Sequence, residues 1–401
     1  MRFMKQGRRL RAIALLALVA MLALALVGCA GTTPASKDAS AGAAKEPIKV
    51  GAVLSLTGSY AGLGASEKKA LELEVKRING AGGINGRSIE LIIADDGTDA
   101  AKAQAATTKL IDQDKVVAII GASGTGQTMA MRSDVERAGI PNVSMAGGSA
   151  ITEKLSPQVF QVPWPNRLVV PFVLAAMKKA GVTKVGVLSD TGGYGKDGLA
   201  VIKAQAPKAG IAIAGEQTFN LGDTDMTPQL TKLKNSGPQA ILLWTAGKEG
   251  ATVLKNRDQL KMTIPFFGGS GQGRKEFISG AGTAAEGFTF GTGKELVPAA
   301  WGSAPNAQVE DDFVKRYKAA YGTDIDVFAG HAYDAINVVA EAARKVSGDL
   351  TPQTLRDAIE KTAGLVAVGG TYTFSPTDHN GLTDKDLQLY VVKNGQFTIA
   401  P

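Results

Sequence analysis

The sequence predicts an α/β fold with two Rossmann-like lobes, each built on a parallel central sheet. Three observations support this prediction. The chain has 401 residues, more than a single hydrophobic core usually organises. From residue 48 onward, short apolar runs alternate with longer amphipathic stretches. The apolar runs are continuous, as in strands of a sheet that helices cover on both faces.

The first block of alternating segments covers residues 48–162. Strands are predicted at 48–54, 88–94, 116–120 and 142–144, and helices at 68–78, 100–112 and 128–138. In the first of these helices, apolar residues recur at the spacing of one helix face: Ala70, Leu71, Leu73, Val75 and Ile78. This block is long enough for one doubly wound sheet.

The second block covers residues 184–288 and is preceded by a predicted helix at 168–180. Its strands are predicted at 184–189, 211–216, 240–244 and 265–267, and its helices at 198–209, 229–235 and 249–260. After residue 292 the pattern changes to helices at 307–321, 328–345 and 352–361, followed by strands at 371–374 and 387–393. We expect this last part to return to the first lobe, with a final piece that crosses to the second.

The N-terminus predicts export. A basic stretch is followed by an apolar run over residues 12–27, which is short for a membrane span and typical of a signal peptide, here residues 1–28. The run ends in Leu26-Val27-Gly28-Cys29, which resembles the lipobox of bacterial lipoproteins, and Cys29 is the only cysteine. We therefore expect lipidation at Cys29, a flexible linker over residues 29–46 and an extracytoplasmic protein anchored to the membrane only by its lipid. An uncleaved anchor helix or an incidental buried thiol is the alternative.

Charge argues against a nucleic-acid partner. The net charge is +7, but five basic residues without any acid lie in the first 28 residues, so the remainder carries 7 − 5 = +2. A nearly neutral body gives no support for a surface that binds phosphates.

Several segments resemble the leucine/isoleucine/valine-binding proteins of bacterial ABC transporters, which have the type I periplasmic-binding-protein fold. The most specific is Asn79-Gly80-Ala81-Gly82-Gly83-Ile84-Asn85-Gly86-Arg87, followed by a strand that ends Ala94-Asp95-Asp96. Other matches lie at 51–58, 117–121, 140–144, 190–195 and 328–334, so that the resemblance covers nearly all of residues 48–397.

The resemblance implies two lobes joined by three crossover strands, near residues 162–165, 287–289 and 370–374, with the ligand in the cleft between the lobes. Lobe 1 is then residues 47–163 plus 289–370, and lobe 2 is residues 164–288 plus 371–401. The resemblance also implies a monomer without a cofactor, whose partners are a small-molecule solute and an ABC transporter permease. Binding by hinge closure follows, because three connecting strands restrict the motion of the lobes.

In the first lobe, candidate ligand contacts lie on the loops after the third and fourth strands, where helix N-termini present unpaired N–H groups. The resemblance implies that Thr125 binds a carboxylate and that Ala146 offers a backbone carbonyl. A second hydroxyl of the family falls near Gly148 or Ser149, and we assign it to Ser149. The candidates in these loops are Thr125, Gly126, Gln127, Ala146, Gly147, Gly148 and Ser149. Ordinary helix caps are the alternative.

In the second lobe, the resemblance implies that Tyr194 covers the ligand. Trp164, at the first crossing, is a further aromatic candidate. Trp244 either faces the cleft or closes the core, and Phe328 is either a pocket or a core residue. The remaining candidates are Thr245, Gly247, Ser270 and Gln272.

Two positions depart from the amino-acid binders of this family. Ser270 stands where they usually carry an acid that pairs with the ligand ammonium, and Leu63 replaces a tyrosine. A buried ammonium without a carboxylate is costly. Either another acid substitutes, or the ligand is a different carboxylate-bearing solute, such as an aromatic or short-chain acid, or an amide-like compound.

Three other functions have weaker or equal support in the sequence: dinucleotide binding, catalysis and ligand sensing. Gly193, Gly195 and Gly198 form a G-x-G-x-x-G pattern with Glu216 downstream, but an exported protein has little access to NAD and Tyr194 would crowd a pyrophosphate. The two histidines, His331 and His379, belong to no metal-spaced cluster, so an enzyme is not expected. A receptor that signals instead of transporting would use the same closure and remains the alternative function.

Overall fold

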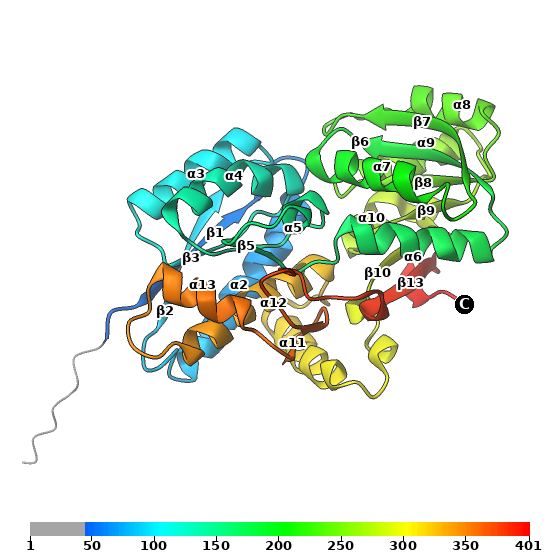
Figure 1. Ribbon diagram of the computed structural model, residues 1–401. Coiled ribbons are helices and arrows are strands. Elements are labelled where there is room, and N and C mark those ends of the chain that lie inside the picture. The colour runs from blue at the N-terminus through cyan, green and yellow to red at the C-terminus, as the bar shows by residue number, and fades with distance from the viewer. Residues whose placement is uncertain (1–44) are drawn as a thin grey trace, which may run out of the picture. The chain divides into compact units, whose positions relative to one another are not determined.

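A computed structural model describes residues 45–401 (Figure 1). The predicted signal peptide, the lipidation of Cys29 and nearly all of the predicted linker lie outside the described residues. Within the described part of the chain, no helix combines the length and the apolar character needed to cross a bilayer.

The first sheet has five parallel strands in the order β2-β1-β3-β4-β5. The strands are β1 (Ile48–Leu54), β2 (Ile89–Asp95), β3 (Ala118–Gly121), β4 (Asn142–Ser144) and β5 (Val159–Gln161), and the helices between them are α2 (Ala61–Gly80), α3 (Ala100–Asp112), α4 (Thr125–Ala138) and α5 (Ala150–Glu153). In β3, Ile119 packs into a different apolar cluster from Ala118 and Ile120. Adjacent side chains therefore serve opposite faces of the sheet, which explains the continuous apolar runs.

The second sheet has the order β14-β13-β10-β9-β8-β6-β7. Its strands are β6 (Lys184–Asp190), β7 (Ala212–Phe219), β8 (Ala240–Trp244), β9 (Phe266–Gly268), β10 (Thr289–Gly293), β13 (Leu387–Lys393) and β14 (Gln396–Ile399), and its helices are α6 (Asn166–Lys179), α7 (Gly193–Gln205), α8 (Thr227–Asn235), α9 (Glu249–Gln259) and α10 (Lys275–Ala281). Helices α6 and α7 pack together, as do α8, α9 and α10. The sheet is not wholly parallel, because β13 runs antiparallel to β10 and β14 antiparallel to β13.

The helices α11 (Pro305–Tyr321), α12 (Val327–Lys345) and α13 (Pro352–Glu360) return to the first lobe, as expected. Helix α12 is buried on nearly all sides and packs against α2. It begins where the Asp326 carboxylate accepts a hydrogen bond from the Ala329 amide at 2.8 Å, and α13 begins at a capping box formed by Thr351 and Thr354. These caps fix the start of each helix.

The structure moves two predicted boundaries. Residues 371–380, which we assigned to lobe 2, contact β5 of the first lobe: the Phe374 ring lies 5.4 Å from the Phe160 ring between centroids, and the Asn380 side-chain amide donates to the Gln161 carbonyl at 3.0 Å. The third crossing therefore follows Asn380. Residues 289–293, which we assigned to lobe 1, form β10 and pair with β9 and β13 in the second sheet. The second crossing therefore follows Gly293 and does not precede Thr289. A short strand that ends in glycines gives little sequence signal, which explains the shift.

Buried hydrogen bonds tie the crossings together. The Tyr372 hydroxyl, in β12 (Thr371–Tyr372), lies within hydrogen-bond distance of two acceptors, the Val162 carbonyl at 2.8 Å and the Asp334 carboxyl group at 2.7 Å. Asp334 also accepts from the amides of Val368 and Gly369, both at 2.8 Å. The first crossing and the segment that leads to the third are thus joined to helix α12 by a single hydrogen-bond network. Strand β12 also pairs with β11 (Leu365–Val366) in a small ladder.

Candidate ligand-binding site

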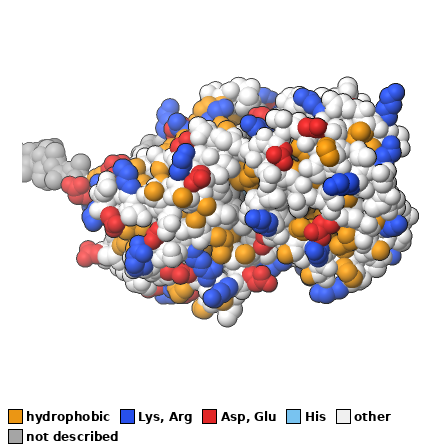
Figure 2. All heavy atoms as spheres, turned by 90° about the horizontal axis from the view of Figure 1, so that it is seen from above, with side chains coloured by type: hydrophobic (Ala, Val, Ile, Leu, Met, Phe, Trp, Pro, Cys, Tyr) orange, Lys and Arg blue, Asp and Glu red, His pale blue; other side chains and the backbone are white. Residues whose placement is uncertain are grey.

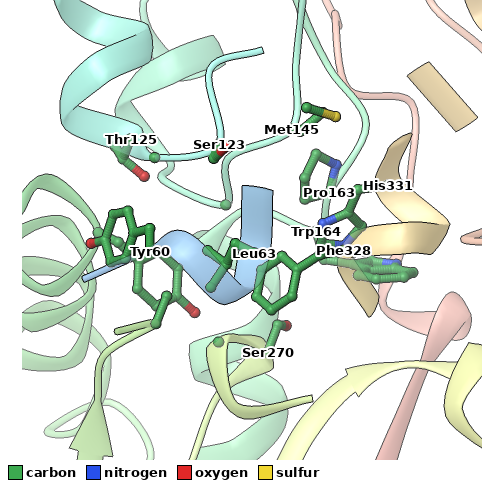
Figure 3. Close-up of a pocket in the computed structure, with 15 residues that line it drawn as sticks. Tyr60, Leu63, Ser123, Thr125, Met145, Pro163, Trp164, Ser270, Phe328 and His331 are labelled. Atoms are coloured by element: carbon green, nitrogen blue, oxygen red, sulfur yellow. The ribbon is translucent and has the colours of Figure 1, made fainter. Parts of the chain in front are cut away.

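A pocket with an empty volume of about 390 Å³ lies where the two lobes meet. Figure 3 shows the side chains converging on it. The first lobe contributes residues at the carboxyl ends of β1, β3 and β4: Tyr60, Leu63, Ser123, Gly124, Thr125, Met145 and Gly147. The first crossing contributes Pro163 and Trp164, the second lobe Tyr194, Ala246, Ser270 and Gly271, and helix α12 Phe328 and His331. The pocket thus occupies the position at which open α/β sheets bind ligands.

Thr125 is the first residue of α4, and its side chain is only 3% exposed. Among the described residues, its hydroxyl has no hydrogen-bond partner. The first amides of an α-helix also lack intrahelical acceptors, so this corner of the pocket offers several donors. Hydrogen-bond donors at a helix N-terminus favour a negatively charged group.

The neighbouring Ser123 is already engaged. Its hydroxyl donates to the Glu67 carboxyl group and accepts a hydrogen bond from the Ser55 amide at 2.9 Å. Burial raises the pKa of Glu67 to about 8, although the hydrogen bond from Ser123 opposes the shift. Glu67 is therefore mainly protonated at neutral pH and presents no charge to the pocket.

Two tyrosines approach the pocket from opposite lobes. Tyr60 precedes α2, and Tyr194 lies in the first turn of α7. Burial raises the pKa of both phenols, so that both remain neutral. The Tyr194 ring stacks on Trp244 with centroids 6.1 Å apart and planes inclined by 20°. Trp244 does not line the pocket. It lies behind Tyr194 and donates its indole N–H to the Asn166 side chain at 3.0 Å. Of the two predicted alternatives for Trp244, the cleft or the core, the structure therefore shows the core.

Trp164, Phe328 and His331 form the aromatic wall (Figure 3). The centroid of the His331 ring lies 5.9 Å from that of the Trp164 ring and 5.7 Å from that of the Phe328 ring, which it meets edge-on. Burial lowers the pKa of His331 to about 3, so the imidazole is neutral. Neither His331 nitrogen nor the Trp164 indole N–H has a partner within residues 45–401. A bound molecule can supply the missing hydrogen bonds.

Of the predicted site residues, the structure brings together Thr125, Gly147, Trp164, Tyr194, Ser270 and Phe328 in the lining of the pocket. The others lie behind it or beside it: Gly126, Gln127, Ala146, Gly148, Ser149, Trp244, Thr245, Gly247 and Gln272.

Several of these outer residues have structural partners that account for their position. The carbonyls of Ala146 and Gly148 accept hydrogen bonds from the Gln161 amide at 2.7 and 2.9 Å. The Ser149 hydroxyl accepts from the Arg167 amide at 2.7 Å and so caps the start of α6. The Gln272 amide donates to the Thr245 carbonyl at 2.7 Å. These groups position the loops of the pocket.

Sequence reasoning did not place Tyr60, Ser123, Met145 or His331 in the site. A signal was available for His331, because it follows Phe328 by three residues on a helix and therefore shares its face. Tyr60 follows the end of β1 by six residues, and only the tertiary structure shows that its ring turns back over the pocket.

The two lobes contact each other around the pocket. The Asp197 carboxylate, on α7, accepts hydrogen bonds from the amides of Ser149 and Ala150 at 2.8 and 3.0 Å. The Ser59 hydroxyl donates to Glu249 at 2.8 Å. These bonds join groups of opposite lobes, so the structure represents a closed arrangement.

The lining contains no charged side chain among the residues described. Nor does any group of three or more His, Cys, Asp and Glu side chains in residues 45–401 have an arrangement that could hold a metal ion. Basic and acidic side chains are interspersed over the face seen in Figure 2. Two α/β lobes that enclose a largely apolar pocket with a few inward polar groups define a two-lobed binding protein.

Comparisons with known proteins agree with this class. The family model described as "Periplasmic binding protein" matches residues 47–396. The leucine-, isoleucine-, valine-, threonine- and alanine-binding protein of Pseudomonas aeruginosa is 26% identical over 372 residues, which cover 90% of this chain and 91% of that protein. The chain belongs to the periplasmic binding protein family, in its leucine/isoleucine/valine-binding-like, type I branch.

Solved structures support the same fold. An extracellular ligand-binding receptor from Rhodopseudomonas palustris is similar with a TM-score of 0.83 and 25% identity, over 88% of this chain and 99% of that one. A branched-chain amino acid transporter substrate-binding protein from Streptococcus pneumoniae, in complex with isoleucine, has a TM-score of 0.78 and 28% identity, over 88% and 97%. The relatives are named as binding proteins or receptors, in agreement with the expectation that this chain is not an enzyme.

Proposed function

We propose that this chain is the extracytoplasmic, lipid-anchored solute-binding protein of an ABC importer, and that its lobes close on a small carboxylate-bearing solute. The observation that carries the proposal is the enclosed interlobe pocket, in which the Thr125 hydroxyl is buried without a partner among the described residues. The solute would be a branched-chain or other amino acid, or a related organic or aromatic acid. The names of the amino-acid-binding and transporter relatives support this solute class and the transport role.

In this mechanism the open form binds the solute on the first lobe, at the N-terminus of α4. Closure then brings Tyr194, from the second lobe, over the solute. Interactions that form only in the closed form shift the population toward it. A membrane permease would recognise the closed form and receive the solute.

The test combines a ligand screen with two substitutions. A thermal-shift screen of amino acids, keto acids, aromatic acids and amides identifies a solute, and calorimetric titration measures its affinity. Thr125→Ala removes a hydrogen bond to a charged group and Tyr194→Ala removes stacking area, so each is expected to weaken binding at least about tenfold without loss of the fold. Unchanged affinity in both variants contradicts the site assignment.

The lipid anchor and the transport role have separate tests. Incorporation of labelled fatty acid is expected in the wild-type chain and is lost in Cys29→Ser. The Rhodopseudomonas palustris relative is named a receptor, which favours ligand sensing as the second candidate function. Deletion of the gene abolishes uptake of the solute if the chain serves transport, and leaves uptake unchanged if it serves sensing alone.

A further inference from the structure

We infer that the pocket takes an apolar carboxylic acid that has no amino group. The inference rests on the proposed function, because it assumes that the pocket binds a solute through a carboxylate. It narrows the solute class by asking whether the pocket holds a partner for the ammonium group of an amino acid.

Three positions that could receive an ammonium group do not offer it a partner. The Ala146 carbonyl is held by the Gln161 amide at 2.7 Å. Gly148 has no side chain, and a Cβ there would lie 2.2 Å from the Thr125 methyl carbon. The hydroxyl of the next residue, Ser149, caps α6 and does not line the pocket.

Gly148 and Ser149 are alternatives for one position, so the third position is Ser270, which lines the pocket with a neutral hydroxyl. No acidic side chain lines the pocket, so none faces a group placed beside Ser270. Glu67 lies behind Ser123 and accepts a hydrogen bond from the Ser123 hydroxyl. Asp190 and Glu249 lie outside the lining. One oxygen of Asp190 accepts from the Gly192 amide at 2.8 Å, and one oxygen of Glu249 accepts from Ser59 and Gly222, both at 2.8 Å, while the second oxygen of each carboxyl group has no partner among the described residues. An ammonium in this pocket would be buried without an ionised partner, which is strongly unfavourable.

The same pocket is well supplied with donors. Hydroxyls of Thr125 and Tyr60 and the indole N–H of Trp164 are all buried, and in the described structure none of them has a partner. Uncharged donors fit one anionic group, and the lining holds no ionised group that could balance a cationic one. Leu63, Met145 and Phe328 supply apolar surface between the polar groups, as Figure 3 shows. The lining therefore matches a carboxylate on an apolar body.

Calorimetric titration of the purified full chain tests the inference with two matched pairs. 4-Methylpentanoate differs from L-leucine, and 3-phenylpropanoate from L-phenylalanine, only by the amino group. We expect the acid to bind at least about a hundredfold more tightly than its amino acid in at least one pair. Tighter binding of the amino acids overturns the inference and leaves the proposed function intact. If neither member of either pair binds, the solute class is wrong, and the broader screen decides separately whether the protein binds any solute.

A substitution tests the assigned cause. Ser270→Glu restores a carboxylate, so it is expected to weaken binding of the acid at least tenfold and to improve binding of the paired amino acid. Ser279→Glu, at an exposed position of α10, is the control and is expected to change neither affinity. If Ser270→Glu binds both ligands as the wild type does, Ser270 does not set the preference. Should this variant fail to fold, the two wild-type pairs still decide the inference.

Discussion

A close backbone approach between the lobes gives a sharp test of closure. Gly193 begins α7 in the second lobe and faces Gly126, in the first turn of α4. A Cβ added to Gly193 would lie 2.3 Å from the Gly126 nitrogen and 2.7 Å from its Cα. Ordinary contacts of a Cβ begin at 3.4 Å. In Gly193→Ala the lobes must therefore separate by roughly 1 Å, or the closed form must be strained.

The penalty applies to the closed form alone, because the clashing atoms belong to opposite lobes. Overpacking of this kind costs about 1–3 kcal/mol, so the solute affinity is expected to fall about five- to 150-fold. Calorimetric titration measures the affinity, and small-angle scattering with saturating solute measures how far the lobes close. The ligand-free protein is expected to unfold at the wild-type temperature or slightly above it, because alanine is the better helix former.

Gly80→Ala is the matched control. Gly80 ends α2 away from the pocket, and a Cβ there would meet nothing within 4 Å. Wild-type affinity in this variant separates the effect of closure from the general effect of replacing glycine. If Gly193→Ala also binds with wild-type affinity and closes fully, the close approach of α4 and α7 is not part of the ligand-bound form, and the reasoning is refuted.

Three further predictions follow from carboxyl groups that accept hydrogen bonds within the fold. Asp197→Asn weakens the bond to the Ser149 amide across the lobes and is expected to speed solute dissociation about five- to tenfold, as stopped-flow measurements would detect; an unchanged rate excludes this latch. Burial raises the pKa of Glu67 to about 8 in the folded state, so stability is lost as pH rises toward that value. Relative to Glu67→Gln, the wild type is expected to lose about 1.4 kcal/mol per pH unit between about pH 5 and pH 8 in urea titrations, and parallel pH profiles would contradict the shift. Asp334→Asn disturbs three buried hydrogen bonds, including that of Tyr372, and is expected to lower the free energy of unfolding by about 2–4 kcal/mol; a loss below about 1 kcal/mol would mean that the network contributes little.

The central elements of the fold could be predicted because their patterns are local. Strands β1, β8 and β13 and helix α3 have the predicted bounds. Helix α2 begins seven residues earlier than expected, because glycine at its start signals a break. Gly64 serves a close contact instead, since a Cβ there would lie 2.2 Å from the Ser55 carbonyl oxygen. The strands β5 and β14 are short and partly polar, so their pairing depends on neighbours distant in the sequence.

The candidate site was predictable where a residue follows a strand of a parallel sheet, as Thr125 and Tyr194 do. It was not predictable where the outcome depends on competition for hydrogen bonds. Nothing in the sequence around Ala146 indicates that Gln161, from the neighbouring strand, takes its carbonyl. The same holds for Ser149, whose hydroxyl serves a helix on the far side of the crossing.

The position of α12 in the fold has a consequence for the order in which the protein can fold. The helix that completes the core of the first lobe is encoded more than 160 residues after the last strand of that lobe's sheet. Until residue 345 is available, α2 lacks the helix against which it packs, and a fragment that ends at residue 163 leaves that face of α2 uncovered. The first lobe therefore matures only after strands β6 to β10 of the second lobe have been synthesised, and the nascent chain stays incompletely folded for most of its length.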